Sequence, residues 1–145
     1  VTTHTLMNAP CPVIAVPESA PIGPVEHIAY ATNFEPKDEK AITELTALAE
    51  KLQAKIHFLH VDKEADARKV EAYRRVEQYP FPFTDFTVVA NPSPAEGIDD
   101  FVQNSQIDML ALFVPNRRLL EWLFHRSFTK KMTFHAKIPL LVFRA

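Results

Sequence analysis

The sequence predicts a three-layer α/β/α sandwich, in which helices cover both faces of a parallel β-sheet. From residue 25 onward, short apolar segments alternate with segments of helical periodicity, which is the pattern of repeated β-α-β units. The segment "IDMLALFV" at 107–114 is almost wholly apolar, as is typical of a strand that is buried on both faces. A chain of 145 residues is long enough for one such domain.

The expected elements follow one another in a regular order. "HIAYAT" at 27–32 predicts the first strand, and an apolar stripe at helical spacing between Ala41 and Leu52 predicts the helix after it. Later strands are expected at 55–61, 86–90, 107–114 and 138–144, and later helices at 63–78, 93–106 and 118–136. Ser93 and Pro94 fit the N-cap and the first turn of one of these helices.

The first two dozen residues do not fit this alternation, but they match the end of the chain. A shift of 127 positions places Pro12 on Pro139 and the apolar "VIAV" on "LLVF". An ordered match of helix tail, proline and apolar strand indicates an internal repeat. We therefore expect 1–17 to be the helix end and final strand of a preceding similar domain, 18–24 to be a linker, and 25–145 to be the main domain.

The composition argues against several classes of protein. A net charge of −2 gives no field that would attract nucleic acid or an acidic membrane surface, and no apolar run approaches the length of a membrane helix. Cys11 is the one cysteine, so it forms no internal disulfide and fits a reducing compartment, with the cytoplasm as the expected location. With two glycines and twelve prolines, glycine-rich phosphate loops are nearly excluded.

No group of histidines has the spacing of metal ligands. His57 and His60 lie three apart on an expected strand, so their side chains point to opposite faces of the sheet. His125 and His135 lie ten apart on an expected helix. We therefore expect structural histidines and no metal site.

The sequence also shows no catalytic partners for the candidate nucleophiles. Neither Ser93 nor Ser127 lies in a GxSxG motif or next to a placed histidine–acid pair, and Ser127 is expected to form local hydrogen bonds instead. Cys11 lies between two prolines with no evident positive charge nearby, so we expect it to be buried and inert. The sequence thus predicts a protein that is not an enzyme.

Positive charge and aromatic side chains cluster after residue 113. The basic residues are Arg117, Arg118, Arg126, Lys130 and Lys131. They fit an anion site built from guanidinium groups or a solvated helix face with Glu121 as a partner, and the second interpretation is favoured. The aromatic residues are Trp122, Phe124, Phe128 and Phe134. They fit a partner surface and packing on the sheet equally well.

Two stretches of the chain resemble the universal stress protein family. They are "HIAYATNFEP…AITELTALAEKLQAKIHFLHV" and "IDMLALFVP…SFTKKMTFHAKIPLLVFRA". The resemblance implies a Rossmann-like fold of the adenine nucleotide alpha hydrolase-like type, with a five-stranded parallel sheet in the order 3-2-1-4-5. It also implies a dimer in which final strands pair, a contact that tandem members make within one chain. We therefore expect an additional antiparallel pairing at the sheet edge between Pro12, Val13, Ile14, Ala15, Val16 and Pro139, Leu140, Leu141, Val142, Phe143.

Many members of this family bind ATP through a loop of the form Gly, two residues, Gly, nine residues, Gly, Ser/Thr. The corresponding positions here are Phe113, Asn116, Arg126 and Ser127, so only the serine is kept. The glycines matter because bare backbone N–H groups must approach the phosphate oxygens. The resemblance thus implies a degenerate nucleotide site at Thr32, Asn33, Val61, Phe113, Asn116, Arg126 and Ser127, in which Asn33 replaces an aspartate.

The expected function follows from this resemblance. It is a non-enzymatic stress-response domain that acts by dimerisation or protein contact, as a homodimer or as a pseudo-dimer with another such domain, and that needs no cofactor. The alternative is a sensor that binds ATP, AMP or another anion through Arg126, Asn116 and Asn33. No nucleic acid or membrane is expected as a partner.

Overall fold

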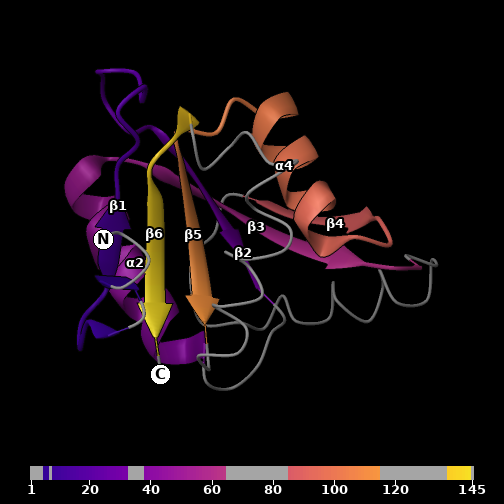
Figure 1. Cartoon of the computed structure of the whole chain (residues 1–145), viewed down its shortest axis with the longest axis horizontal. Coiled ribbons are helices and arrows are strands. Elements are labelled where there is room, and N and C mark those ends of the chain that lie inside the picture. Colours follow the sequence, from indigo (N-terminus) through magenta and orange to yellow (C-terminus); the bar gives the residue numbers. More distant parts are fainter. Residues whose placement is uncertain (1–4, 7, 33–37, 65–84, 115–136, 145) are drawn as a thin grey trace.

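A six-stranded sheet runs through the part of the chain that the structure describes, and a helix packs on each of its faces (Figure 1). The computed structural model describes residues 5–6, 8–32, 38–64, 85–114 and 137–144. The strands are β1 (Val13–Ala15), β2 (His27–Ala31), β3 (Lys55–Asp62), β4 (Asp85–Ala90), β5 (Met109–Val114) and β6 (Leu140–Arg144), and the helices are α2 (Asp38–Leu52) and α4 (Pro94–Asn104).

The strand order is β1-β6-β5-β2-β3-β4. The five strands from β2 to β6 are parallel to one another and follow the order 3-2-1-4-5, as expected. The expected edge pairing is also present, because β1 lies antiparallel beside β6 with Val13 opposite Val142 and Ala15 opposite Leu140. This ladder is three residues long. Pro12, which has no N–H to donate, and Val16 lie outside it.

The element boundaries agree with the predictions to within one or two residues. Both β5 and β6 begin two residues later than predicted, at Met109 and Leu140. At β5, the residue before the strand, Asp108, makes its contacts with the start of β2. Residues 63 and 64 form a bend, not the expected start of a helix. The rest of the predicted helix 63–78 and all of the predicted helix 118–136 lie outside the described residues.

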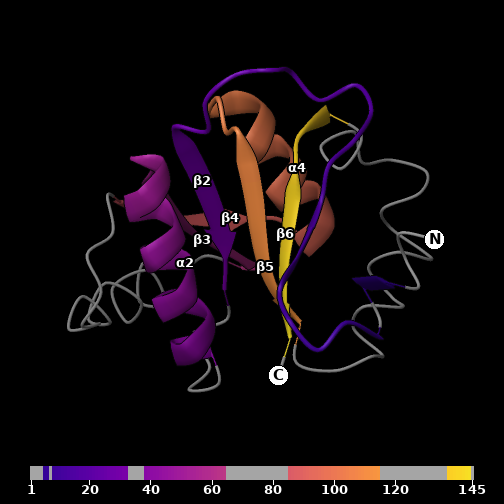
Figure 2. The same cartoon turned by 90° about the vertical axis from the view of Figure 1, so that its left-hand side faces the viewer.

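Each face of the sheet has its own hydrophobic core, and Figure 2 shows α2 and α4 on opposite sides of the strands. On the α2 face, Tyr30 and Phe58 are almost fully buried, and their rings meet edge to face at 5.6 Å between centroids. On the α4 face, Leu59 and Leu110 pack with Leu6 from the N-terminal segment. Neither helix of the described part of the chain is long and apolar enough to cross a membrane.

Asp108 fixes the register between β2 and β5. Its Oδ2 atom accepts hydrogen bonds from the backbone N–H groups of Glu26 and His27, both at 2.9 Å. Its own N–H donates to the carbonyl of His27, also at 2.9 Å. One carboxylate therefore satisfies two donors at the start of β2 and holds that strand against the start of β5.

Both helices end without the glycine that commonly terminates a helix. Gln53 after α2 and Gln106 near the end of α4 adopt left-handed backbone angles, with φ of 55° and 53°. The amide of Ala54 then reaches back to the carbonyl of Ala49 at 2.9 Å, as in a Schellman motif. A chain with two glycines has thus placed glutamine at two positions that favour glycine.

Gly97 has a packing reason to be glycine. It is buried within α4, and a Cβ atom at this position would lie 2.8 and 3.0 Å from the two Cγ atoms of Val61. It would also lie 3.3 Å from Cβ of Asn91. The missing side chain therefore lets α4 approach the carboxyl end of β3.

We expect Gly97→Ala to lower the free energy of unfolding by about 1–3 kcal/mol, because overpacking against Val61 outweighs the better helix propensity of alanine. Urea unfolding measures the change. Gly23→Ala is the matched control, since nothing lies within 4 Å of the added methyl, and it should change stability by less than about 1 kcal/mol. Adding Val61→Ala to Gly97→Ala should relieve the clash, so the two changes should not add. A Gly97→Ala protein as stable as the parent would contradict the packing argument.

Candidate functional site

Three of the seven residues of the expected nucleotide site are described, namely Thr32, Val61 and Phe113. Each lies at or near the carboxyl end of a parallel strand, which is where ligands bind in sheets of this kind. Asn33, Asn116, Arg126 and Ser127 lie outside the described residues, as do the basic and aromatic residues noted between 117 and 134.

Thr32 uses both of its backbone polar groups within the chain. Its N–H donates to the carbonyl of Leu59 at 2.9 Å, and its carbonyl accepts from Nδ1 of the buried His60 at 2.8 Å. Because a carbonyl only accepts, this contact places a hydrogen on Nδ1 of His60. His60 therefore joins the end of β3 to the residue after β2, which is a structural role, as the sequence suggested.

Val61 and Phe113 lie on opposite faces of the sheet. Val61 packs in the core beneath α4, against the position of Gly97. Phe113 is half-buried in the core beneath α2 and pairs with Phe143 of β6 in the parallel ladder. The structure therefore does not gather the described members of the predicted site around one space.

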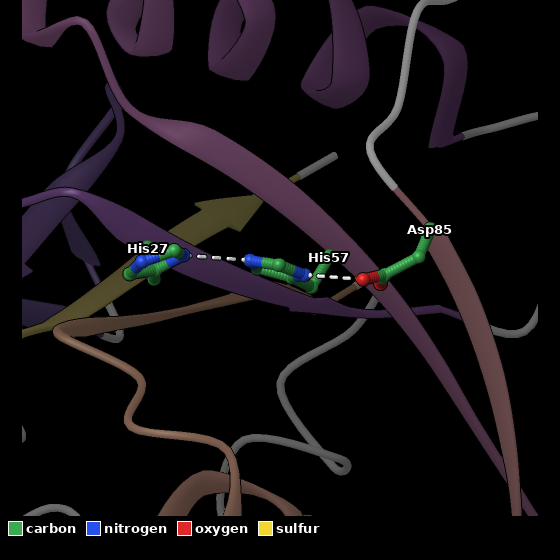
Figure 3. Close-up of polar contacts among 3 residues, drawn as sticks. All are labelled: His27, His57 and Asp85. Atoms are coloured by element: carbon green, nitrogen blue, oxygen red, sulfur yellow. Dashed lines mark hydrogen bonds and ion pairs between the residues drawn. The ribbon is translucent and has the colours of Figure 1, made fainter.

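A second polar group lies near the amino ends of the strands and joins three neighbours, β2, β3 and β4 (Figure 3). Nδ1 of His27 lies 2.9 Å from Nε2 of His57. Nδ1 of His57 lies 2.8 Å from Oδ2 of Asp85. The two imidazole rings are tilted by 35°, with 5.2 Å between their centroids. These three residues are called the His27–His57–Asp85 chain below.

The geometry assigns a direction to the two hydrogen bonds of the His27–His57–Asp85 chain. An ionised carboxylate only accepts hydrogen bonds, so the hydrogen between His57 and Asp85 belongs to Nδ1 of His57. In a neutral imidazole the other nitrogen then accepts, so Nδ1 of His27 is the donor to Nε2 of His57. When both rings are neutral, each histidine therefore carries its hydrogen on Nδ1, and both N–H bonds point toward Asp85.

The His27–His57–Asp85 chain ties strands together and does not form a metal site. Its nitrogens face one another instead of a common centre, and no group of three potential ligands in the described ranges could hold a metal ion. His57 is mostly buried, whereas the side chain of Asp85 is half exposed. The sequence shows that His27, His57 and Asp85 each lie at or near the start of an expected strand. It does not show the ladder register that aligns His57 with Asp85.

The other candidate residues have plain local roles. The hydroxyl of Ser93 accepts from the N–H of Glu96 at 3.3 Å, so Ser93 is the N-cap of α4, as predicted. Cys11 is exposed, so the expectation that it is buried was wrong. It lies two residues before Val13, the first residue of β1, and therefore outside the ladder with β6.

The fold is that of an α/β protein with a parallel sheet, a helix on each face and a strand order that reverses between β2 and β5. A model of the Universal stress protein family matches residues 24–144. The chain belongs to this family. No curated protein matches the sequence.

Among the solved structures that resemble the chain are the following two. A universal stress protein from Archaeoglobus fulgidus DSM 4304 superposes with a TM-score of 0.73 at 12% identity, over 99% of this chain and 53% of that chain. The present chain thus spans about half the length of that protein. The hypothetical protein MJ0577 superposes with a TM-score of 0.51 at 18% identity, over 85% of this chain and 98% of that chain. At identities this low, the superpositions show a shared fold and nothing more specific.

We expect nitrogen NMR shifts at neutral pH to show both His27 and His57 with hydrogen on Nδ1. Asp85→Asn should release this preference, because an amide can donate as well as accept. It should lower stability by less than about 1 kcal/mol, since the carboxylate is half exposed. Asp100→Asn, at an exposed position of α4, is the control and should leave both tautomers unchanged. Finding hydrogen mainly on Nε2 of His57 in the parent protein would refute the assigned direction.

Proposed function

We propose that this chain is a universal stress protein domain that does not bind ATP through the family loop and that acts through contacts with protein. Family membership supports a role in stress response. The proposal includes the absence of catalysis. In the described ranges, the hydroxyl of Ser93 caps a helix, and the His27–His57–Asp85 chain includes no serine, threonine or cysteine that its histidines could activate. A cytoplasmic location is part of the proposal and rests on the single cysteine.

The position of Phe113 is the observation that carries this proposal. The resemblance aligns Phe113 with the first glycine of the ATP loop, where bare backbone would have to meet a phosphate. Here the residue is part of β5, aligned with Phe143, and its ring packs into the core beneath α2. Replacing a glycine by a packed phenyl ring gives this segment a structural use that competes with phosphate binding.

Two more contacts support the same conclusion. The backbone N–H and carbonyl of Thr32 are hydrogen-bonded inside the chain. The methyl groups of Val61 are in contact range of Gly97 in α4. At these two positions of the predicted site, the backbone groups of Thr32 and the side chain of Val61 are already engaged within the protein.

The proposed contact surface is the outer side of β1. Ile14 and Val16 are 44% and 67% exposed, and in the described part of the chain β1 has a neighbouring strand on one side only. An exposed strand edge with apolar side chains favours pairing with another strand. The Archaeoglobus protein, of which this chain covers about half, is matched over nearly all of this chain and therefore over the segment that contains β1. A second copy or another domain of the same family fits this edge.

The alternative function is a sensor that binds a nucleotide or another anion through Arg126, Asn116 and Asn33. Guanidinium groups bind phosphate well, so loss of the glycines does not by itself remove every means of binding. The two functions differ in one measurable property, which is whether a nucleotide stabilises the folded chain.

We expect ATP, ADP and AMP at millimolar concentration to change the melting temperature by less than about 1 °C, because only a ligand that binds the folded state raises it. Differential scanning calorimetry gives the measurement. Arg126→Ala and Lys51→Ala serve as a pair, since Lys51 is an exposed cation at the far end of α2. A clear rise that Arg126→Ala abolishes and Lys51→Ala keeps would establish the sensor and overturn the proposal.

We expect the chain to self-associate through β1 when no other domain covers this edge. Ile14→Lys should shift the equilibrium toward monomer by at least about tenfold, because a charge would have to be desolvated in the interface. Sedimentation equilibrium over a range of concentrations measures this. Leu52→Lys is the matched control, since Leu52 is 40% exposed on α2. An association that Leu52→Lys weakens as much as Ile14→Lys, or a monomer at all concentrations, would count against β1 as the contact.

A further inference from the structure

The contact between Nδ1 of His27 and Nε2 of His57 has room for one hydrogen (Figure 3). The two nitrogens lie 2.9 Å apart, which is the length of an ordinary hydrogen bond with its hydrogen between them. In a neutral pair, one ring supplies the hydrogen and the other supplies the lone pair. If both rings were charged, both nitrogens would carry hydrogen and neither could accept. The contact would then be a repulsion between two cations.

One additional proton can enter the His27–His57–Asp85 chain without the loss of either hydrogen bond. If His27 takes it, the hydrogens between the three residues stay where the neutral chain has them. If His57 takes it, Nε2 of His57 donates to Nδ1 of His27, and His27 carries its own hydrogen on Nε2. In both arrangements, Nδ1 of His57 still donates to Oδ2 of Asp85. The chain therefore accommodates one additional proton but not two.

The histidine pair lies on the face of the sheet that α4 covers. Side chains alternate along a strand, so His27 and His57 share this face with Ala29 and Leu59, which belong to the core beneath α4. The residues that α4 buries are uncharged, and its acids lie outside that set; the buried residues are Ala95, Gly97, Ile98 and Val102, and the acids are Glu96, Asp99 and Asp100. The helix thus brings no buried charge to this face.

The charged groups near the pair come from the neighbouring strands and their flanks. Asp85 on β4 accepts from the pair at 2.8 Å. Asp108 lies before β5, and its Oδ2 accepts from the backbone N–H groups of Glu26 and His27. Lys55 lies opposite His27 in the ladder of β2 and β3, and both Lys55 and Glu26 are exposed. Among the described residues, Asp85 is thus the carboxylate that the rings contact, and one carboxylate balances one positive charge.

From the single hydrogen that fits between the rings, we propose that the His27–His57–Asp85 chain is an acid-sensitive catch. It links β2, β3 and β4 near their amino ends while the histidine pair holds at most one additional proton. The contact between His27 and His57 opens when both rings are charged. The catch is independent of the proposed protein contact, because β1 and β4 lie at opposite ends of the strand order.

The catch determines how stability changes in mild acid. A free histidine titrates near about pH 6.5, so most unfolded chains carry a proton on both residues at about pH 5.5. A folded chain with the catch closed carries one proton on the pair. Stability falls with decreasing pH wherever the unfolded state binds more protons, and a difference of one proton changes the unfolding equilibrium constant about tenfold per pH unit. We therefore expect the pair to favour unfolding by up to about tenfold per pH unit below about pH 6.

Urea unfolding of the parent chain and of His27→Gln, at several pH values between about 7 and 5, measures this contribution. Glutamine takes up no proton, so the variant removes the conflict, and its unfolding constant should lack the additional pH dependence. His57→Gln and the double variant should show the same loss as His27→Gln, because either change alone abolishes the contact. Lys55→Gln is the matched control: it removes a neighbouring cation, leaves the contact between the rings and should keep the pH dependence of the parent.

Nitrogen NMR shifts of the parent chain give a second measurement that needs no variant. As the pH falls from about 7 to about 5.5, we expect the pair to gain one proton in total, with hydrogen on Nδ1 of His57 throughout. At lower pH, entry of the second proton should move the ring signals together with the amide signals of residues 55–58, because the contact opens at that point.

Three results would overturn the proposal. The first is the same pH dependence of unfolding in the parent and in His27→Gln. The second is a Lys55→Gln variant that loses as much pH dependence as His27→Gln, which would show general charge repulsion and not a contact limited to one hydrogen. The third is an NMR titration in which both rings become charged together near pH 6.5 while the amide signals of β3 stay in place.

Discussion

The contact between Asp108 and the start of β2 is the constraint on which the rest of the arrangement depends. β2 and β5 are neighbours in the sheet although about eighty residues separate them, and it is between these two strands that the order reverses. A slip of one residue would turn every side chain of β5 to the other face, and so exchange the cores beneath α2 and α4. One carboxylate that accepts from two consecutive N–H groups makes that slip costly. With this register fixed, the carboxyl ends of all five parallel strands meet at one edge.

The described residues at the carboxyl edge of the sheet are engaged within the chain in one place and border a small space in another. Near β2 and β3, the backbone of Thr32 is bonded within the chain and Val61 packs on Gly97. Near β5 and β6, the rings of Phe113 and Phe143 border a small space that the segment before β1 completes. The polar contacts at the opposite edge, from His27 to Asp85, link β2, β3 and β4.

Sequence patterns identified the parts of this structure that depend on local periodicity. The apolar run that contains β5, the N-cap at Ser93 and the edge strand near Pro12 were all recognisable, because each is encoded by adjacent residues. Features that depend on register were not predicted. Asp108 was read as part of a strand, because nothing local shows that its carboxylate meets the start of β2. Likewise, His57 was compared with His60, its neighbour in sequence, whereas its hydrogen-bonding partners are 30 and 28 residues away. The exposure of Cys11 was misjudged because it depends on where the chain enters the sheet.

Because of the antiparallel strand β1, the boundary of the family match and the boundary of the folded sheet lie at different residues. Sequence similarity to the family begins at residue 24, but the hydrogen-bonded sheet begins at Val13. The segment that the family model matches is therefore smaller than the unit that satisfies its own backbone. A polypeptide cut at the similarity boundary would keep every recognisable feature and yet leave the N–H and carbonyl groups along one side of β6 open to any passing strand. For this fold, the first residue of the family match is therefore a poor guide to where the chain can be shortened.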